Sequence, residues 1–207
     1  VHSLRKALSH QTLQRENKAY REHLEATNRE LKLGLDELRA DQQAGRHAQL
    51  RMLPEPLNMG DVSCEHKLQP SLMLSGDFLD FMEVDDDRLA FYIADVTGHG
   101  ASSAFVTVLL KNLTYRLKRN FQRGSSDDIL KPDLVLGRIN NELLASELDK
   151  HLTMFYGVLT LSTGVLSYSV GGHFPMPVLI SKGEARFFEG RGMPVGLFRE
   201  AEYNQYL

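Results

Sequence analysis

The rhythm of hydrophobic and polar positions changes near Pro54. Residues 1–53 contain no proline, and their apolar side chains recur at helical spacing rather than in alternation. Because proline cannot continue a helix, this pattern predicts one long helix that ends before Pro54. We therefore divide the chain into a helical stalk over 1–53 and a folded domain over 54–207.

The leucines of the stalk also follow a heptad. Leu24, Leu31 and Leu38 occupy three successive a positions, and Asn17 occupies another. A leucine seam with one buried asparagine that sets the register is compatible with a parallel two-stranded coiled coil. The d positions are weaker and include Asp41, so a single amphipathic helix lying on its own domain is the alternative. We expect a homodimer through this helix.

After Pro54 the pattern is that of a mixed domain. Alternating or short apolar runs between turn residues predict strands, which cover 63–74, 77–84, 88–95, 153–161, 164–170, 177–181 and 184–188. Helical spacing predicts two helices, over 100–119 and over 132–147, the second with Pro132 in its first turn. The first helix presents one apolar stripe, made of Ala104, Phe105, Val108, Leu109, Leu113 and Leu117.

The order of these elements indicates the fold class. Strand hairpins come first, then the helix pair, then further hairpins. This order favours an α/β (α+β) fold with antiparallel sheets and segregated helices over a repeated βαβ pattern. The acidic run Asp85-Asp86-Asp87 lies between two predicted strands, and a hairpin turn explains it without any further role.

Composition excludes several classes of protein. The 207 residues carry a net charge of −3, which argues against nucleic acid as the main partner. Cys64 is the only cysteine, so no disulfide scaffold is possible and a reducing compartment is favoured. No apolar run approaches the roughly 20 residues of a membrane span, and no signal peptide is visible. We expect a cytoplasmic protein with no membrane partner.

Two short motifs combine aspartate with glycine. Asp77 follows Ser75-Gly76, and Asp95 opens the run Asp95-Val96-Thr97-Gly98-His99-Gly100. A strand, a tight turn and a returning strand between the two aspartates would bring their carboxylates together. Carboxylates beside backbone carbonyls suit hard divalent cations such as Mg²⁺ or Mn²⁺.

The glycines of the second motif point to an anion. Gly98 and Gly100 would allow a sharp turn and leave free amides at the N-terminus of the next helix, where an anion can bind. The alternative is that a strand simply ends in a helix cap and Asp95 bonds to turn amides. Such short motifs are weak evidence when they stand alone.

Together, the motifs resemble a known family. Ser-Gly-Asp-Phe-Leu-Asp (75–80) and Ile-Ala-Asp-Val-Thr-Gly-His-Gly (93–100) are similar to the paired metal motifs of the PPM (PP2C-like) serine/threonine phosphatases, in particular the bacterial SpoIIE/RsbU type. Further similar segments begin at Gln49, His151, Gly171 and Gly192. The resemblance implies a PP2C-like sandwich of two antiparallel sheets flanked by helices, preceded by the helical linker.

The resemblance also implies a two-metal site that binds Mn²⁺ or Mg²⁺. Asp95 would bridge both ions, Asp77 would bind directly or through water, and the backbone carbonyl of Val96 would complete one shell. The metals would activate water for attack on a phosphoserine or phosphothreonine. His99 and His173 would act as general acids or shape their glycine turns, and Gly76, Gly98, His99 and Gly100 would lie on the phosphate side.

The chain departs from the family near its end. The family completes its metal site with two more aspartates near the C-terminus, and no matching motif precedes Leu207. We therefore expect the C-terminal end of the domain to be missing, or the site to be incomplete. With Asp77 and Asp95 alone, metal affinity would be poor, because few anionic ligands offset dehydration of the ion.

A narrower resemblance leaves a second function open. The helix, the run 95–100 and the segment 192–205 are similar to the output half of RssB-like bacterial response regulators. In some of those, the domain binds a sigma factor without hydrolysis, and a receiver domain lies upstream. We thus expect either a phosphatase acting on a phosphorylated, anti-sigma-antagonist-like regulator or an adaptor that binds a sigma factor or such an antagonist. The retained aspartates favour the phosphatase.

Overall fold

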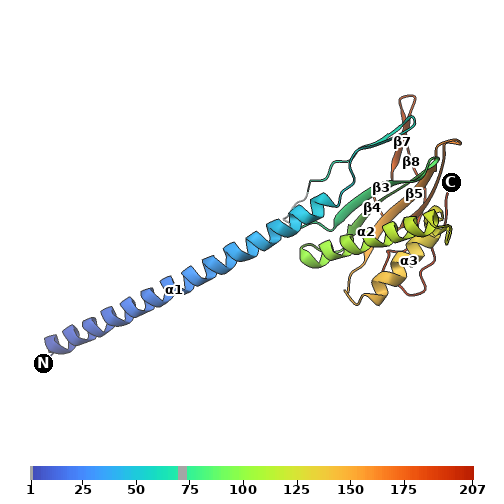
Figure 1. Cartoon of the computed structure of the whole chain (residues 1–207). Helices are drawn as coiled ribbons and strands as arrows, with labels where there is room; N and C mark the ends of the chain where they lie inside the picture. Colours follow the sequence, from blue (N-terminus) through green and yellow to red (C-terminus); the bar gives the residue numbers. More distant parts are fainter. Residues whose placement is uncertain (1, 70–73) are drawn as a thin grey trace. The chain divides into compact units, whose positions relative to one another are not determined.

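The structure is a computed structural model that describes residues 2–69 and 74–207, without the side chains of 2–9. Its contacts divide the chain into two units, Val1–Ala44 and Gly45–Leu207 (Figure 1). The predicted domain boundary at residue 54 stays a prediction.

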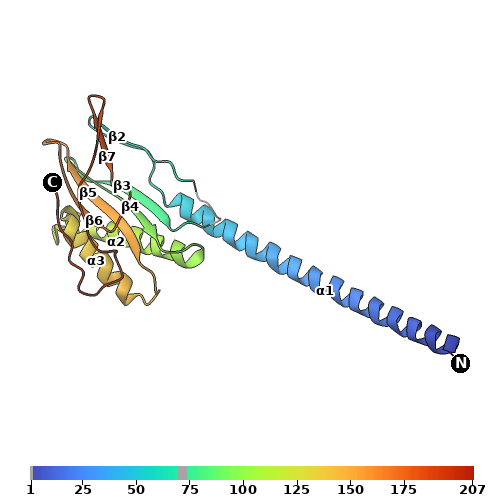
Figure 2. The ribbon, with the colours of Figure 1, turned by 180° about the vertical axis from the view of Figure 1, so that it is seen from behind.

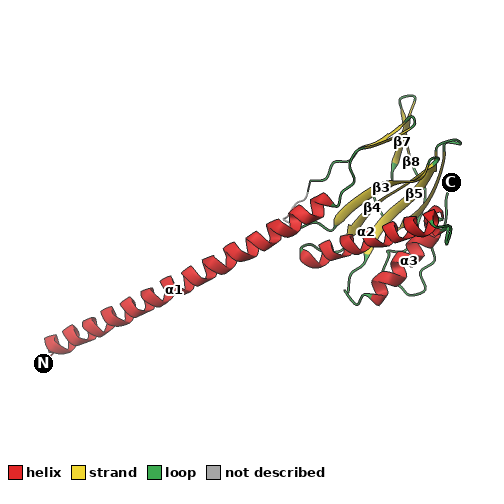
Figure 3. Cartoon of the chain, in the orientation of Figure 1, coloured by secondary structure: helices red, strands yellow, loops and turns green. Residues whose placement is uncertain are grey.

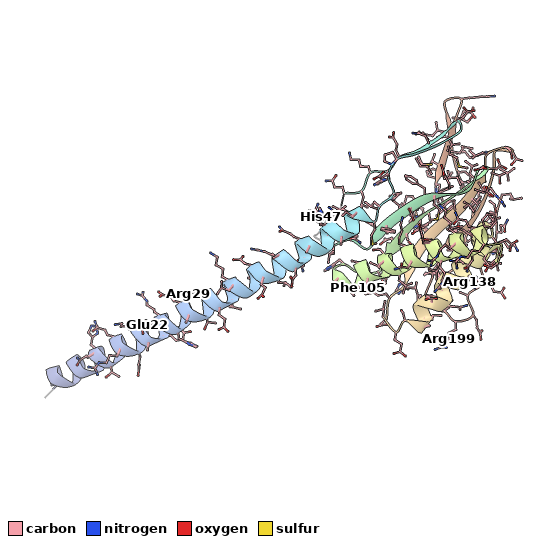
Figure 4. All side chains as sticks on the ribbon, in the orientation of Figure 1. Glu22, Arg29, His47, Phe105, Arg138 and Arg199 are labelled. Atoms are coloured by element: carbon pink, nitrogen blue, oxygen red, sulfur yellow. The ribbon has the colours of Figure 1, made fainter. Side chains whose placement is uncertain are left out.

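Helix α1 (His2–Arg51) forms the first unit up to Ala44. The last turns of the helix, from Gly45 onward, belong to the second unit. The helix ends before Pro54, as the sequence predicted. Side chains project from it on all sides, as Glu22 and Arg29 do in Figure 4. Among the described residues, no helix has both the length and the apolar character needed to cross a membrane.

The heptad leucines Leu24, Leu31 and Leu38 are exposed on α1. The ion pairs along the helix, Lys18–Glu22 at 3.9 Å and Asp36–Arg39 at 3.7 Å, are exposed and long, so they add little stability. An isolated helix with exposed leucines gains stability when another surface covers them. A second copy of the helix would be such a surface, and the coiled-coil homodimer stays a prediction.

The second unit contains short strands and helices in the predicted order (Figure 3). Its strands are β1 (Leu57–Met59), β2 (Val62–Cys64), β3 (Asp77–Asp85), β4 (Arg88–Val96), β5 (Leu152–Thr160), β6 (Val165–Gly171), β7 (Val178–Ser181) and β8 (Glu184–Phe187). Its helices are α2 (Ala101–Gln122), the 3₁₀ turn η1 (Asp128–Leu130) and α3 (Pro132–Ala145).

Every pairing between two of these described strands is antiparallel, which confirms the predicted α/β fold class. The largest sheet has the order β3-β4-β5-β6, and β1-β2 and β7-β8 form two separate two-stranded ribbons. One predicted strand, over 63–74, is wrong in length. Within it only Ser63–Cys64 has ladder partners, in β1, and neither residues 65–69 nor Leu74 form a strand. Residues 70–73 of that prediction lie outside the described residues.

Helices α2 and α3 cover one face of the four-stranded sheet, as Figure 1 and the reverse view in Figure 2 show. This face carries the main core, in which Phe78, Tyr92 and Tyr156 from the strands meet Leu110 and Ile139 from the helices. Because successive strand residues alternate between faces, the neighbours of these core residues point to the other face. We call that second face the open face.

The predicted stripe of α2 is partly wrong. Phe105, labelled in Figure 4, is 64% exposed, and Val108 is exposed as well, whereas Val106 and Leu110 are fully buried. Two overlapping apolar stripes run along this helix, and both satisfy helical spacing. The sheet covers the one that contains Val106 and Leu110.

The segment that begins at Gly192 crosses strands β5 and β6. Val195 is fully buried and exchanges two backbone hydrogen bonds with Leu152, at 2.8 and 2.9 Å. A side chain at Gly192 would overlap the carbonyl oxygen of Val170. The buried side chain of Asn140 accepts a hydrogen bond from the Gly196 amide at 2.7 Å. The Gly-Met-Pro-Val-Gly-Leu motif thus has a structural role.

Candidate functional site

The pairing of β3 with β4 places Asp77 directly opposite Asp95. The Val96 N–H donates to the Gly76 carbonyl at 3.2 Å, so Gly76 and Val96 form a hydrogen-bonded pair. In an antiparallel ladder the adjacent pair is then non-hydrogen-bonded, and its side chains approach most closely. The two predicted carboxylates therefore lie side by side on the open face.

Gly76 makes this close pairing possible. A Cβ atom at residue 76 would overlap the Val96 carbonyl oxygen and lie 3.1 Å from the Gly98 carbonyl oxygen. The hydroxyl of Ser75 accepts a hydrogen bond from the Asp77 amide at 3.0 Å, which holds the start of the strand. The Val96 carbonyl lies beside Gly76, and its role as a metal ligand stays a prediction.

The predicted glycine turn follows β4. Gly98 and Gly100 have φ angles of +80° and +85°, a region that glycine enters without strain. The Thr97 carbonyl accepts hydrogen bonds from the Lys150 ammonium at 3.1 Å and from the Ser103 hydroxyl at 3.0 Å. Lys150 thus places a positive charge beside the turn that leads into α2.

Strand β5 adds a residue that the sequence analysis missed. Thr153 lies opposite Asp95, so Asp77, Asp95 and Thr153 form a row across three strands of the open face. The Thr153 hydroxyl is 3.1 Å from Nδ1 of His173. The alternation of strand residues shows that Thr153 points to the same side of β5 as Phe155. Only the pairing of β4 with β5 shows that this side is the open face, which carries Asp77 and Asp95.

The two candidate histidines lie in different surroundings. His173 is half-buried and lines a cleft together with Asp77 and Asp95. His99 is exposed and does not line this cleft. The structure therefore brings His173 to the carboxylates and leaves His99 on the glycine turn.

The cleft combines both signs of charge with apolar walls. Lys67 lies at its rim, and Phe174 extends from the segment that carries His173. Lys67 is a second residue that the sequence analysis missed. No motif marks residues 65–69, and only the folded chain shows that Lys67 lines the same cleft as the two aspartates. A cation that lines the same cleft as two carboxylates suits a ligand that carries negative charge of its own.

The electrostatics show the cost of pairing the carboxylates. Burial and, next, repulsion by Asp95 raise the pKa of Asp77, while His173 lowers it. Burial also lowers the pKa of His173, and both carboxylates oppose that shift. Two like charges placed side by side repel each other unless a cation or proton lies between them.

The paired aspartates resemble a binding site for a divalent metal in the type of their donor atoms. Asp77 and Asp95 offer hard oxygen donors at one place, which is the ligand type that Mg²⁺ and Mn²⁺ prefer. In the part of the chain that the structure describes, no group of three or more His, Cys, Asp or Glu side chains could hold a metal. The two carboxylates fit such a cation in donor type, and the metal site itself stays a prediction.

Most of the second unit, including Asp95 but not Asp77, matches a known family. Residues 85–206, more than half of the chain, match the family described as Stage II sporulation protein E (SpoIIE). The chain belongs to the SpoIIE family. The resemblance inferred from the sequence is thereby confirmed at the level of the family.

Comparisons with individual proteins agree with this family. The chain is 28% identical to Protein IcfG of Synechocystis sp. (strain ATCC 27184 / PCC 6803 / Kazusa) over 196 residues, which cover 84% of this chain and 30% of that protein. It is 27% identical to Phosphoserine phosphatase RsbP of Bacillus subtilis (strain 168) over 163 residues, 76% of this chain and 38% of RsbP. The chain thus spans about a third of the length of these curated relatives.

A solved structure supports the fold. The SiaA-PP2C domain of Pseudomonas aeruginosa superposes with a TM-score of 0.63 at 16% identity, and the match covers 84% of this chain and 67% of that chain. At this identity the likeness concerns the fold alone. The chain has the fold of a PP2C domain, as the sequence analysis expected.

Proposed function

We propose that this chain is the output domain of a bacterial response regulator and acts as a metal-dependent protein serine/threonine phosphatase in sigma-factor or stress-response control. The observation that carries the proposal is the direct opposition of Asp77 and Asp95 on β3 and β4. Membership of the SpoIIE family and similarity to the phosphoserine phosphatase RsbP support it.

In this proposal Asp77 and Asp95 hold Mn²⁺ or Mg²⁺, with the carbonyl of Val96 as a further ligand. Such a cation supplies water activation and neutralises charge on a phosphoryl group. His173 has its Nδ1 engaged with Thr153, so its Nε2 is the ring nitrogen left to move a proton.

The positive charges around the site suit a phosphorylated substrate. Lys67 lines the cleft of the paired aspartates, and an ammonium attracts a phosphate as a point charge. The glycine turn at Gly98 and Gly100 leads into the N-terminus of α2, where amides and the helix dipole favour an anion. We propose a phosphoserine or phosphothreonine of a regulatory protein, such as an anti-sigma antagonist, as the substrate.

The test is a Mn²⁺ titration by calorimetry, followed by hydrolysis of a phosphoserine peptide, on the protein and on two variants. Asp95→Asn removes one of the paired carboxylates and should abolish both binding and hydrolysis. Asp86→Asn is the matched control, because Asp86 is exposed in the turn between the same two strands. Hydrolysis that is unchanged in Asp95→Asn would overturn the site assignment.

A second function is favoured by a specific observation. The described residues bring only two carboxylates together and no larger metal-binding group. An adaptor that binds a sigma factor or an anti-sigma antagonist would need the fold but no metal. Mn²⁺ binding by neither the protein nor its variants, together with saturable binding of an unphosphorylated sigma factor, would establish this alternative.

The stalk carries the remaining part of the proposal. We propose that α1 pairs with a second copy through Leu24, Leu31 and Leu38, with Asn17 setting the register. An upstream receiver domain would control this pairing, and the protein would act in the cytoplasm. Sedimentation should show a dimer that Leu31→Lys weakens. Leu33→Lys is the control, because Leu33 is an equally exposed leucine outside the a and d positions.

A further inference from the structure

Gln49 is a buried polar residue in the last turns of α1, within the second unit. It is only 5% exposed, whereas its neighbours His47, seen in Figure 4, and Leu50 are exposed. Burial of a side-chain amide is unfavourable unless each of its polar groups finds a partner. The partners of Gln49 therefore indicate what this residue does.

The side-chain amide of Gln49 forms hydrogen bonds with both the carbonyl and the N–H of Ser75. Its Nε2 donates to the Ser75 carbonyl at 2.7 Å, and its Oε1 accepts the Ser75 N–H at 3.1 Å. Ser75 in turn accepts the Asp77 N–H through its hydroxyl at 3.0 Å. Two hydrogen-bonded steps thus connect the helix to the residue that bears the candidate metal-binding carboxylate.

The same amide also contacts α2. Nε2 of Gln49 donates to the Thr107 hydroxyl at 3.2 Å, and this hydroxyl donates to the Ala104 carbonyl at 2.7 Å. Helix α2 starts directly after the glycine turn that follows Asp95. One side chain therefore joins Ser75, which lies just before the strand that carries Asp77, to the helix that follows the turn after Asp95.

We propose that Gln49 is a positioning residue that sets the place of Asp77 relative to Asp95. The inference rests on the proposed function, because it assigns a task to the metal site of that proposal. Both N–H groups of the Gln49 amide donate and its oxygen accepts one hydrogen bond, so a side chain without an amide would lose at least one of these three bonds. The contacts also require the chain to be helical at residue 49, so the end of the linker helix becomes part of the site's support.

The test compares Gln49→Leu with Gln43→Leu. Leucine is similar in size to glutamine and removes all three hydrogen bonds, and Gln43 is an exposed glutamine on the same helix. Mn²⁺ affinity should fall about 10-fold or more in Gln49→Leu, the range seen when residues behind a metal ligand are changed. Gln43→Leu should bind as the unaltered protein does.

Hydrogen exchange without metal provides a second readout. The amides of Ser75 and Asp77 should exchange at least about 10-fold faster in Gln49→Leu, because the first loses its acceptor and the second loses its fixed partner. The amide of Tyr92, in the middle of β4, should be unaffected. Gln49→Glu retains an acceptor for the Ser75 N–H and should give an intermediate result, which serves if Gln49→Leu does not fold.

The outcomes separate the two proposals. If the unaltered protein binds Mn²⁺ and Gln49→Leu binds equally well, or if the Ser75 and Asp77 amides exchange at the same rate in both, the role of Gln49 is refuted while the metal site stands. If the unaltered protein binds no Mn²⁺, the proposed function fails, and the positioning role fails with it. Weaker binding with faster local exchange supports both.

Discussion

Asp77 and Asp80 belong to one short motif but lie on opposite faces of the same strand. The offset of three residues is odd, so strand alternation sends their side chains to different sides of the sheet. Asp77 is exposed on the open face opposite Asp95. Asp80 is 2% exposed on the face that α2 and α3 cover, and it pairs with Lys111 at 2.7 Å.

The difference teaches how one residue type can serve two purposes. Burial raises the pKa of Asp80 more than the hydrogen bond and charge of Lys111 lower it. The ion pair therefore compensates only part of the cost of burial, as expected for a buried salt bridge. Asp77 faces solvent and another carboxylate, an arrangement that is unfavourable without a ligand. Asp80 is part of the packing between sheet and helix, and Asp77 is part of the candidate site.

Among substitutions on strand β3 and next to it, the largest effect should follow from Asp77→Asn. We expect Mn²⁺ affinity to fall by more than about 100-fold, because a direct ligand matters more than the residues behind it. Stability should not fall, because the substitution removes a charge whose burial and, next, whose repulsion by Asp95 raise the pKa of Asp77. Calorimetry and thermal unfolding on one sample measure both. A large loss of stability would mean that Asp77, like Asp80, is a structural residue.

Gly76→Ala should act on the pairing of the two strands. The added Cβ would overlap the Val96 carbonyl, and backbone atoms cannot move away cheaply. We expect a loss of about 2–3 kcal/mol in the free energy of unfolding, the range of overpacked sites. Urea denaturation measures it, with Gly34→Ala as the control, because an added Cβ at Gly34 meets no atom within 4 Å. Equal stability of both variants would contradict the close approach.

Asp80→Ala should destabilise the protein by about 2 kcal/mol, because it removes the partner of Lys111 and the acceptor of the Phe81 amide. Lys111 is partly exposed and can regain water, which limits the loss. Mn²⁺ affinity should stay within a few-fold of the unaltered protein. If metal affinity is lost instead, the two faces are not independent, and the contrast between Asp77 and Asp80 fails.

The smallest effect concerns pH. Because the pKa of Asp80 is raised by folding, the folded state binds its proton more readily than the unfolded state. The free energy of unfolding therefore falls as pH rises from the model-peptide value of 3.8 through the raised pKa. Relative to Asp80→Asn, which has no such proton, the unaltered protein should be more stable at pH 4 than at pH 7. Urea denaturation at both values tests the sign.

Much of the local structure was predictable from the sequence. Period-two runs and turn residues located β3 to β6, and Pro132 marked the first turn of α3. The strand predicted over 63–74 failed, because an apolar run becomes a strand only where a partner accepts its hydrogen bonds. The apolar stripe predicted for α2 was partly wrong, because two sets of apolar residues on this helix both recur at helical spacing. Phe105 belongs to the set that the sheet leaves exposed.

The candidate site was predictable only in outline. Asp77, Asp95 and the glycines stood out because their residue types suit metal and phosphate chemistry at short spacing. Thr153 and Lys67 did not stand out, since each is ordinary in its own segment, and Gln49 was noted only as the start of a segment similar to the family. Their proximity to the site depends on strand register and on the path of the chain.

The sequence by itself determined the long helix, the order of the strands and helices, and the two aspartates of the paired motifs, because each depends on neighbours within a few residues. Only the tertiary structure decided which aspartate of the motif at 75–80 faces Asp95 and which is buried on Lys111. It also decided that Gln49, distant in the chain, supports Ser75. Such contacts arise from the packing of segments far apart in sequence, and no local pattern records them.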